Sequence, residues 1–215
     1  MIEPLVCLEN ITKSFQQPLL NIEKFEIFYG KCIIITGNNG SGKSTLLKII
    51  NGLVDADSGN IKFQQKKFLA KKKHLLAKNS IYLSSKPYFF DCSVENNIRY
   101  PLWLNSRKEQ SNLIDQALKL SELTHLRKHH SDSLSSGEKQ RLALARAYMI
   151  NPNIWLLDEP TEHLDVNAKK QFYQLLNKLL SENHSIIIAT HSQDIGTQVP
   201  HQHFHLTKGQ LKYGN

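Results

Sequence analysis

The sequence predicts an α/β fold in which a mainly parallel sheet is covered by helices on both faces. Three short apolar runs, at 33–35, 154–157 and 186–189, show no alternation with polar residues. Such continuous runs are typical of strands that are buried on both faces of a sheet. Segments in which apolar residues recur at helical spacing separate these runs along the chain, and strands alternating with helices favour a parallel sheet.

The N-terminal residues are expected to form short strands. Val6–Leu8, Ile22–Phe28 and Cys32–Thr36 are mainly apolar or β-branched, and Gly30 is a turn signal between the last two. Further along the chain, a turn and two more strands are expected at Asp55–Asn60, Ile61–Phe63 and Ser80–Leu83.

A glycine-rich segment follows the strand that is expected to end at Thr36. It fits the phosphate-binding pattern G-x-x-x-x-G-K-[ST] with Gly37, Asn38, Asn39, Gly40, Ser41, Gly42, Lys43, Ser44 and Thr45. An apolar, helix-compatible run begins at Leu46, so free N–H groups at a helix N-terminus would face an anion. We expect Lys43 to reach the β- and γ-phosphates and the Ser44 hydroxyl to ligate Mg²⁺. An ordinary glycine turn is the alternative.

The middle of the chain has helical character. From Ser93 to about His130, apolar residues recur at helical spacing, among them Leu113, Ile114, Ala117, Leu118 and Leu120. A second helix is expected from about Gly137, and an amphipathic helix from Phe172 to Leu180.

Two carboxylates follow the expected buried strand at 154–157. Asp158 lies at the strand end, where it can hold Mg²⁺ beside a γ-phosphate, and Glu159 can then polarise an attacking water. The alternative is a pair of acids that only cap the strand. Downstream of a phosphate-binding loop, the pair favours the division of labour between metal and water.

Together with further motifs, these residues resemble those of ATP-binding cassette (ABC) ATPases. Residues 134–141, Leu-Ser-Ser-Gly-Glu-Lys-Gln-Arg, resemble the family signature, usually Leu-Ser-Gly-Gly-Gln. Asp158–Thr161 resembles the Walker B extension, Leu164–Asp165 the D-loop and His191 the switch histidine.

The resemblance implies a P-loop NTPase core with a mainly parallel sheet, an N-terminal antiparallel β-subdomain and an inserted α-helical subdomain. It implies a single ABC ATPase domain over residues 1–215, with the core at about 1–87 and 134–215 and the helical subdomain at about 88–133.

The resemblance also implies roles for site residues. Ser135–Glu138 fit a capping box, and in the family this helix N-terminus meets the γ-phosphate held by the opposite subunit. Ser135, Ser136, Gly137 and Glu138 would therefore contact ATP bound by a second chain. His191 would hydrogen-bond the γ-phosphate, so that the catalytic residues are Glu159, His191 and Lys43. Phe15 would stack on adenine, or else it is a core residue.

The chain departs from the family at two motifs. Ser85 holds the Q-loop place, where a Gln normally ligates Mg²⁺ and signals to the membrane partner. Serine is shorter, so either a water bridges the gap or Mg²⁺ coordination is weaker. We hypothesise that ATP turnover is then less tightly coupled to the partner. In the signature, Ser136 replaces a Gly and Glu138 a Gln, changes that bear on turnover more than on ATP binding.

Composition is compatible with a cytosolic chain. No apolar run approaches the roughly 18 residues of a membrane span, and no signal peptide is expected at the N-terminus. Cys7, Cys32 and Cys92 are scattered, which favours a reducing compartment. Part of the net charge of +8 lies in Lys62, Lys66, Lys67, Lys71, Lys72, Lys73 and Lys78. This run is either a solvated face or a contact for anionic lipid or nucleic acid.

The resemblance implies an ATP-binding and ATP-hydrolysing subunit that powers transport of a solute across a membrane through separate transmembrane subunits. ATP and Mg²⁺ would be its cofactors. Its partners would be a second ABC ATPase chain, most simply in a homodimer, transmembrane permease subunits and a substrate-binding protein, with no nucleic acid. It would lie on the cytoplasmic face of the inner or plasma membrane. Residues 93–102 resemble those of importer-type subunits.

The permease groove would use aromatic residues near the Q-loop, which could equally form the core of the helical subdomain: Tyr88, Phe89, Phe90, Val94 and Tyr100–Trp103. The alternative function is a soluble cassette that acts on ribosomes or nucleic acid, echoed by Gly137–Lys139 and Thr161–Asp165. That branch carries two cassettes in one chain, whereas this chain has room for one. An ATP-binding scaffold without hydrolysis is disfavoured by Glu159 and His191.

Overall fold

The structure, a computed structural model, describes residues 3–64, 66–69, 74–104, 111–162, 164–191 and 198–214. Its contacts divide the chain into two compact units. The first unit comprises Met1–Ser84, Asn153–Pro160 and Asn177–Asn215, and the second comprises Ser85–Pro152 and Thr161–Leu176. Each unit is described by itself below, and α6 (Val166–Ser181) begins in the second unit and ends in the first.

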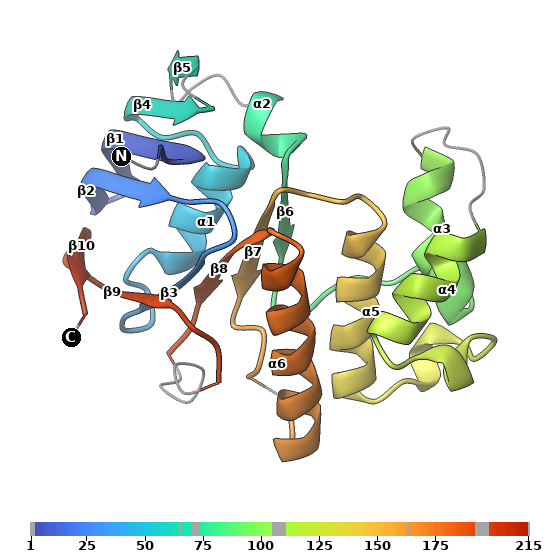
Figure 1. The fold of residues 1–215 in the computed structure, drawn as a ribbon. Coiled ribbons are helices and arrows are strands. Elements are labelled where there is room, and N and C mark those ends of the chain that lie inside the picture. The colour runs from blue at the N-terminus through green and yellow to red at the C-terminus, as the bar shows by residue number, and fades with distance from the viewer. Residues whose placement is uncertain are drawn as a thin grey trace. The chain divides into compact units, whose positions relative to one another are not determined.

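A six-stranded sheet with the order β10-β9-β3-β8-β7-β6 forms the centre of the first unit (Figure 1). Its strands are β3 (Cys32–Thr36), β6 (Ser80–Leu83), β7 (Ile154–Asp158), β8 (Ser185–Ala189), β9 (Gln202–Thr207) and β10 (Gln210–Tyr213). Every residue of β7 and β8 is buried. These neighbours pair in parallel, except that β10 pairs antiparallel with β9, so the mainly parallel sheet is confirmed.

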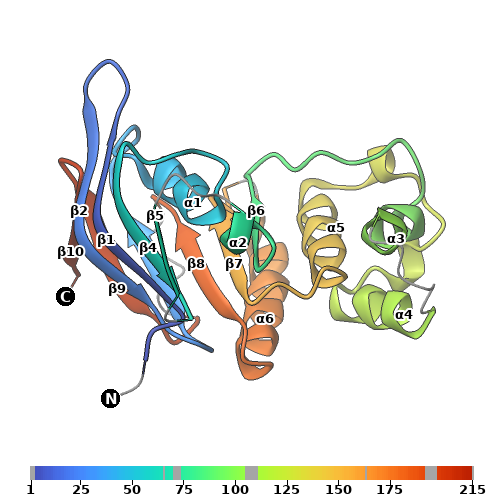
Figure 2. The same cartoon turned by 90° about the horizontal axis from the view of Figure 1, so that it is seen from above.

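A second sheet in this unit is antiparallel and has the order β2-β1-β4-β5 (Figure 2). Its strands are β1 (Val6–Ser14), β2 (Pro18–Ile27), β4 (Ser58–Phe63) and β5 (Lys66–Leu69). The turn expected over Asp55–Asn60 is shorter than predicted, because Ser58 already pairs with Thr12 of β1. The N-terminal antiparallel β-subdomain is confirmed.

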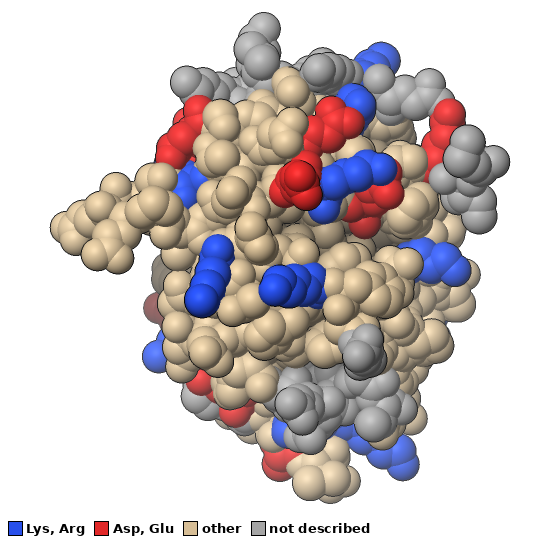
Figure 3. Space-filling model, turned by 90° about the vertical axis from the view of Figure 1, so that its left-hand side faces the viewer, with Lys and Arg blue, Asp and Glu red and all other residues tan. Residues whose placement is uncertain are grey.

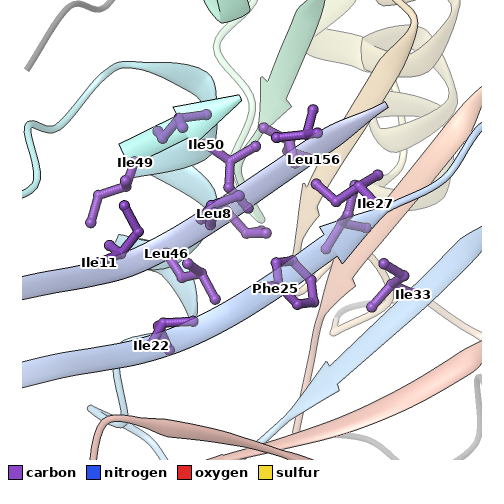
Figure 4. Packing of buried hydrophobic residues seen from close by; sticks show 14 of the residues in the cluster. Leu8, Ile11, Ile22, Phe25, Ile27, Ile33, Leu46, Ile49, Ile50 and Leu156 are labelled. Atoms are coloured by element: carbon purple, nitrogen blue, oxygen red, sulfur yellow. The ribbon is translucent and has the colours of Figure 1, made fainter. Parts of the chain in front are cut away.

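Helix α1 (Lys43–Asn51) shares one apolar core with both sheets. Leu46 and Ile50 of α1 are fully buried in the same cluster as Leu8 and Ile22 of the antiparallel sheet and Leu156 of β7 (Figure 4). A short helix, α2 (His74–Ala77), leads into β6. This packing fixes the N-terminal end of α1 beside the carboxyl ends of β3 and β7, where the candidate site residues lie.

The second unit is helical, as expected. It contains α3 (Val94–Leu104), α4 (Ser111–Leu120), two 3₁₀ turns at Thr124–Leu126 and Ser131–Ser133, and α5 (Ser136–Tyr148). The sequence placed 134–152 with the core, whereas α5 groups with α3 and α4. The reason is packing: Leu142 and Ala145 of α5 are buried in one cluster with Ile98 of α3 and Leu118 of α4. Within the described part of the chain, none of the helices combines the length and apolar character that a bilayer span requires.

Of the lysine-rich run, Lys71–Lys73 lie outside the described residues. Lys62 pairs with Glu9 across β1 and β4, and Lys24 pairs with Glu26 at 2.9 Å on β2. Figure 3 likewise shows acidic and basic side chains intermixed on the face that it draws. Charges that are paired in this way support the solvated-face interpretation for Lys62.

The three cysteines are free thiols, in agreement with the expectation from their spacing. Cys7 and Cys32 are buried and Cys92 is half-buried. Burial raises the pKa of the Cys32 thiol to about 12. Burial is also the main cause that raises the pKa values of Cys7 and Cys92, with Glu26 and Asp91 adding to it respectively.

Candidate functional site

The glycine-rich segment forms the turn between β3 and α1, as predicted. Gly42 is the N-cap of α1 and has a φ of 103°, in the left-handed region that glycine adopts without strain. A Cβ at this position would lie 2.7 Å from the Leu20 side chain. Among the described residues, no side chain caps α1 at this end. The first N–H groups of the helix are therefore available to an anion.

The Lys43 side chain turns back over this loop. Its Nζ donates to the carbonyl oxygen of Gly37 at 2.8 Å and to that of Asn38 at 3.3 Å. Only 6% of the residue is exposed, and Nζ lies 3.9 Å from Glu159 Oε1. A buried ammonium and a helix N-terminus thus add positive potential at one point, which suits a polyphosphate.

Asp158 ends β7 beside α1 and is contacted from two sides. The Ser44 hydroxyl donates to Oδ1 at 3.0 Å, and the Tyr82 hydroxyl donates to Oδ2 at 2.7 Å. Asp158 is 9% exposed. An adjacent hydroxyl and carboxylate provide the hard oxygen ligands that Mg²⁺ prefers, so Ser44 and Asp158 fit this ion. Burial, and then the bond to Asp158, raise the pKa of Tyr82, which keeps its phenol a donor.

Glu159 follows in a strained backbone conformation. Its φ of 48° lies in the left-handed region, which costs a non-glycine residue about 1–3 kcal/mol. The Glu159 N–H donates to the carbonyl oxygen of Ala189 in β8 at 2.8 Å. That bond anchors the residue and directs its carboxylate toward Lys43 on one side and His191 on the other.

His191 lies just beyond β8 and meets the Glu159 carboxylate twice. Its Nδ1 is 3.0 Å from Glu159 Oε2, and its backbone N–H donates to the same oxygen at 3.2 Å. The His191 side chain is about half exposed. The structure therefore brings Lys43, Glu159 and His191 together, although Lys43 and Glu159 are 116 positions apart along the chain and Glu159 and His191 are 32 apart.

Phe15 lies between β1 and β2 and is 67% exposed. The alternative that it is a core residue is therefore wrong. Lys13 Nζ lies 5.2 Å from the centroid of its ring, a cation–π contact. Stacking of this ring on adenine stays a prediction.

In the second unit, the predicted capping box is confirmed. The Ser135 hydroxyl accepts the Glu138 N–H at 3.3 Å, and Glu138 Oε2 accepts the Ser135 N–H at 2.7 Å. The bond from the Ser135 backbone is the main cause that lowers the pKa of Glu138. Its carboxylate is thus charged and turned back onto its own helix, while Ser136 forms the first residue of α5.

Gly137 has a packing reason to be glycine. A Cβ there would lie 2.8 Å from the Cβ of Ala168 in α6. Asp165 caps α6, since its Oδ1 accepts the Ala168 N–H at 2.8 Å.

Ser85 is the first residue of the second unit. The contacts that Ser85 and Ser135–Glu138 would make with a nucleotide stay predictions, and His163 lies outside the described residues.

The sequence reasoning missed Tyr82. It assigned this residue only to a strand, because the pairing register that places Tyr82 near Asp158 is seen only in the structure. Tyr82 pairs with Leu156 of β7, two positions before Asp158, and alternate residues of a strand share a face.

Comparisons with known proteins agree with this geometry. A family model described as "ABC transporter" matches residues 20–162. The chain is 32% identical over 213 residues to the sulfate/thiosulfate import ATP-binding protein CysA of Escherichia coli strain K12, an alignment that covers 95% of the chain and 58% of that protein. The chain spans about half the length of the first curated relatives that it matches.

Two solved structures are also similar. The structure of cbiO1 from Clostridium perfringens, described as part of the ABC transporter complex cbiONQ, has a TM-score of 0.86 and 28% identity, and the match covers 98% of this chain and 87% of that one. The dimeric post-hydrolysis structure of the ATP-binding cassette MJ0796, bound to ADP and Pi, has a TM-score of 0.81 and 27% identity over 96% of each chain.

Proposed function

Because the chain belongs to the ABC transporter family, we propose that it binds ATP and hydrolyses it to ADP and phosphate. The observation that carries this proposal is the convergence of Lys43, Glu159 and His191 beside the N-terminus of α1. These groups provide a cation for phosphate, a base for water and a hydrogen-bonding partner for that base.

The phosphates would lie against the loop from Gly37 to Thr45. The free N–H groups at the start of α1 would bind phosphate oxygens, and Lys43 would exchange the carbonyl oxygens of Gly37 and Asn38 for the β- and γ-phosphates. Ser44 and Asp158 would hold Mg²⁺, which supplies charge neutralisation between the phosphates. Phe15 would offer an exposed ring to adenine.

Glu159 would accept a proton from the attacking water. His191 orients this carboxylate through two contacts to Oε2, which leaves Oε1 directed toward Lys43 at 3.9 Å. A base held in this way is positioned before the water arrives, which reduces the entropic cost of reaching the transition state.

We also propose that two such chains sandwich ATP between them. Ser135, Ser136, Gly137 and Glu138 lie at a helix N-terminus that carries a capping box, and they would meet the γ-phosphate held by the second chain. The dimeric form of the similar cassette MJ0796 supports this arrangement. A single cassette domain with a core and a helical subdomain, in which α5 groups with α3 and α4, belongs to the same proposal.

The hydrolysis would drive transport of a solute through separate permease subunits at the cytoplasmic face of a membrane, in an importer with its substrate-binding protein. The transport names of the similar proteins support this over action on ribosomes or nucleic acid. Of the proposed docking residues, Tyr88 and Trp103 are 76% and 73% exposed, whereas Val94 and Leu102 are buried. The aromatic segment is thus divided between surface and core.

Four aromatic residues of this segment form a connected row, in which Tyr88 and Trp103 are exposed and Phe90 and Tyr100 are half-buried. Ring centroids are 5.9 Å apart for Tyr88 and Phe90, 4.1 Å for Phe90 and Tyr100, and 5.9 Å for Tyr100 and Trp103. The Arg146 guanidinium of α5 lies 5.9 Å from the Phe90 ring, a member of this row, and 5.3 Å from the neighbouring Phe89 ring. A rigid aromatic row suits a partner helix, because aromatic anchors contribute much of the binding energy at interfaces.

Phosphate release by the purified chain tests the enzymatic part. Glu159→Gln should slow hydrolysis by about 10²–10⁴-fold while nucleotide binding persists, and Lys43→Ala should weaken nucleotide binding itself. Glu23→Gln, an exposed acid on β2, serves as the control and should match the wild type. A Glu159→Gln variant that hydrolyses ATP at the wild-type rate would remove the assignment.

Co-purification tests the transport part. When the unmodified protein is purified together with its partners, an integral membrane protein should co-purify with it. Replacing Tyr88 and Trp103 by Ser should abolish this co-purification. Recovery with ribosomes instead would support the alternative function and contradict the transport proposal.

A further inference from the structure

Tyr82 and Asp158 come from neighbouring parallel strands and point to the same face of the sheet. β6 pairs with β7 so that Tyr82 lies opposite Leu156. Asp158 is two residues beyond Leu156 and therefore shares its face. A tyrosine is long enough to reach diagonally from one strand to the end of the next, which a shorter polar side chain at this position could not do.

Helix α1 closes this arrangement from above the same face. Ser44 donates to Asp158 Oδ1 at 3.0 Å, and Lys48, one helical turn later, has its Nζ 5.7 Å from the centroid of the Tyr82 ring. Tyr82 also packs against the apolar core shared by α1 and both sheets. The ring is thus fixed by packing, so its hydroxyl has a defined position.

The Tyr82 hydroxyl contacts one carboxylate oxygen of Asp158 and leaves the other to Ser44. Its bond to Oδ2 is 2.7 Å long, the usual length of a well-formed O–H···O hydrogen bond. A free carboxylate rotates about its last torsion with little cost. With Oδ2 held, Oδ1 is directed at Ser44, the residue beside which the metal would be held.

We propose that Tyr82 is a positioning residue for the divalent cation. It would present a single oxygen of Asp158 to the cation from outside the first coordination shell, as the partners of metal ligands commonly do. This inference rests on the proposed Mg²⁺ site at Ser44 and Asp158.

The Tyr82→Phe variant tests this role, because it removes the hydroxyl and keeps the ring beneath Lys48. The affinity of a fluorescent, non-hydrolysable ATP analogue is measured as a function of Mg²⁺, and Mn²⁺ binding is followed by electron paramagnetic resonance. We expect the apparent affinity for either cation to fall roughly 10-fold. The affinity for the analogue without metal, and the Tm, should match the wild type.

Tyr213→Phe is the matched control. Tyr213 lies on β10, is 68% exposed and has its ring 5.1 Å from that of Phe204. Loss of its hydroxyl should leave cation affinity unchanged.

Three results would overturn the proposal, each in a different way. Equal cation affinity in Tyr82→Phe and wild type would remove the role of Tyr82 and leave the metal site intact. A weaker affinity for the analogue without metal would show that Tyr82 supports the fold of the site in general. No effect of Mg²⁺ or Mn²⁺ on the wild type would remove the proposed metal site and the role of Tyr82 together.

Discussion

Glu159 combines a reactive side chain with a positive φ angle. Glycine adopts such an angle without strain, asparagine and aspartate adopt it less readily, and other residue types rarely adopt it. Its φ of 48° is maintained by the bond from its N–H to Ala189 and by the two contacts of its carboxylate with His191. Strain at such positions persists when the surrounding structure determines the conformation. The side chain is thus aimed by contacts with the end of β8 and with the residue just beyond it.

This strain can be measured by comparing two substitutions that both remove the carboxylate. Glu159→Gly should be more stable than Glu159→Ala by about 1 kcal/mol, because glycine adopts the left-handed region without a Cβ clash. Chemical denaturation of the two variants gives the difference in unfolding free energy. Alanine as stable as glycine would show that the backbone relaxes and stores no strain at this position.

At the scale of elements, the cap of α5 links stability to pH. The Ser135 N–H holds the pKa of Glu138 below its ordinary value. The folded chain therefore keeps this carboxylate ionised to a lower pH than the unfolded chain does. Its contribution to stability is complete above the unfolded pKa, about 4.3, and is lost as the pH falls through the folded pKa.

Glu138→Gln should consequently flatten the acid side of the stability profile. Glutamine can still accept the Ser135 N–H but does not titrate, so unfolding free energy should fall less steeply below about pH 4.5 than in the wild type. Denaturant unfolding at a series of pH values measures both slopes. Superimposable slopes would mean that this box does not contribute to acid sensitivity.

The strands β7 and β8, the capping box of α5 and the grouping of α5 with other helices differ in how far the sequence predicts them. The runs at 154–157 and 186–189 are apolar throughout, so burial on both faces, and hence β7 and β8, follows from local pattern. The capping box depends on Ser135 and Glu138 alone and is equally local. The grouping of α5 with α3 and α4 depends on which distant apolar residues Leu142 meets, and no periodicity within α5 contains that information.

The same distinction applies to the candidate site. Gly37–Thr45 and Asp158 were found because spacing and a strand end mark them in the sequence, and His191 was found through the resemblance to the family. Tyr82 was missed because its role depends on the register between β6 and β7. The left-handed backbone of Glu159 could not be predicted either, since it results from contacts with β8.

At the scale of the whole molecule, the proposed site would be completed by a second chain. Blocking hydrolysis should then stabilise the dimer, because the closed form can no longer convert its ATP. Glu159→Gln with ATP should elute from size-exclusion chromatography at about twice the mass of the wild type in the same buffer without nucleotide. Lys43→Ala with ATP is the comparison and should remain at the smaller mass. Identical elution of the two variants would contradict the sandwich arrangement.

The burial of the cysteines provides the chain with a built-in measure of its own unfolding. All three thiols have raised pKa values, that of Cys32 reaching about 12, so the reactive thiolate is scarce while the chain is folded. Unfolding returns each thiol to water and to its ordinary acidity. Timed alkylation followed by mass measurement would therefore report opening around β1, β3 and the loop before α3 separately, in the unmodified protein and without an introduced label.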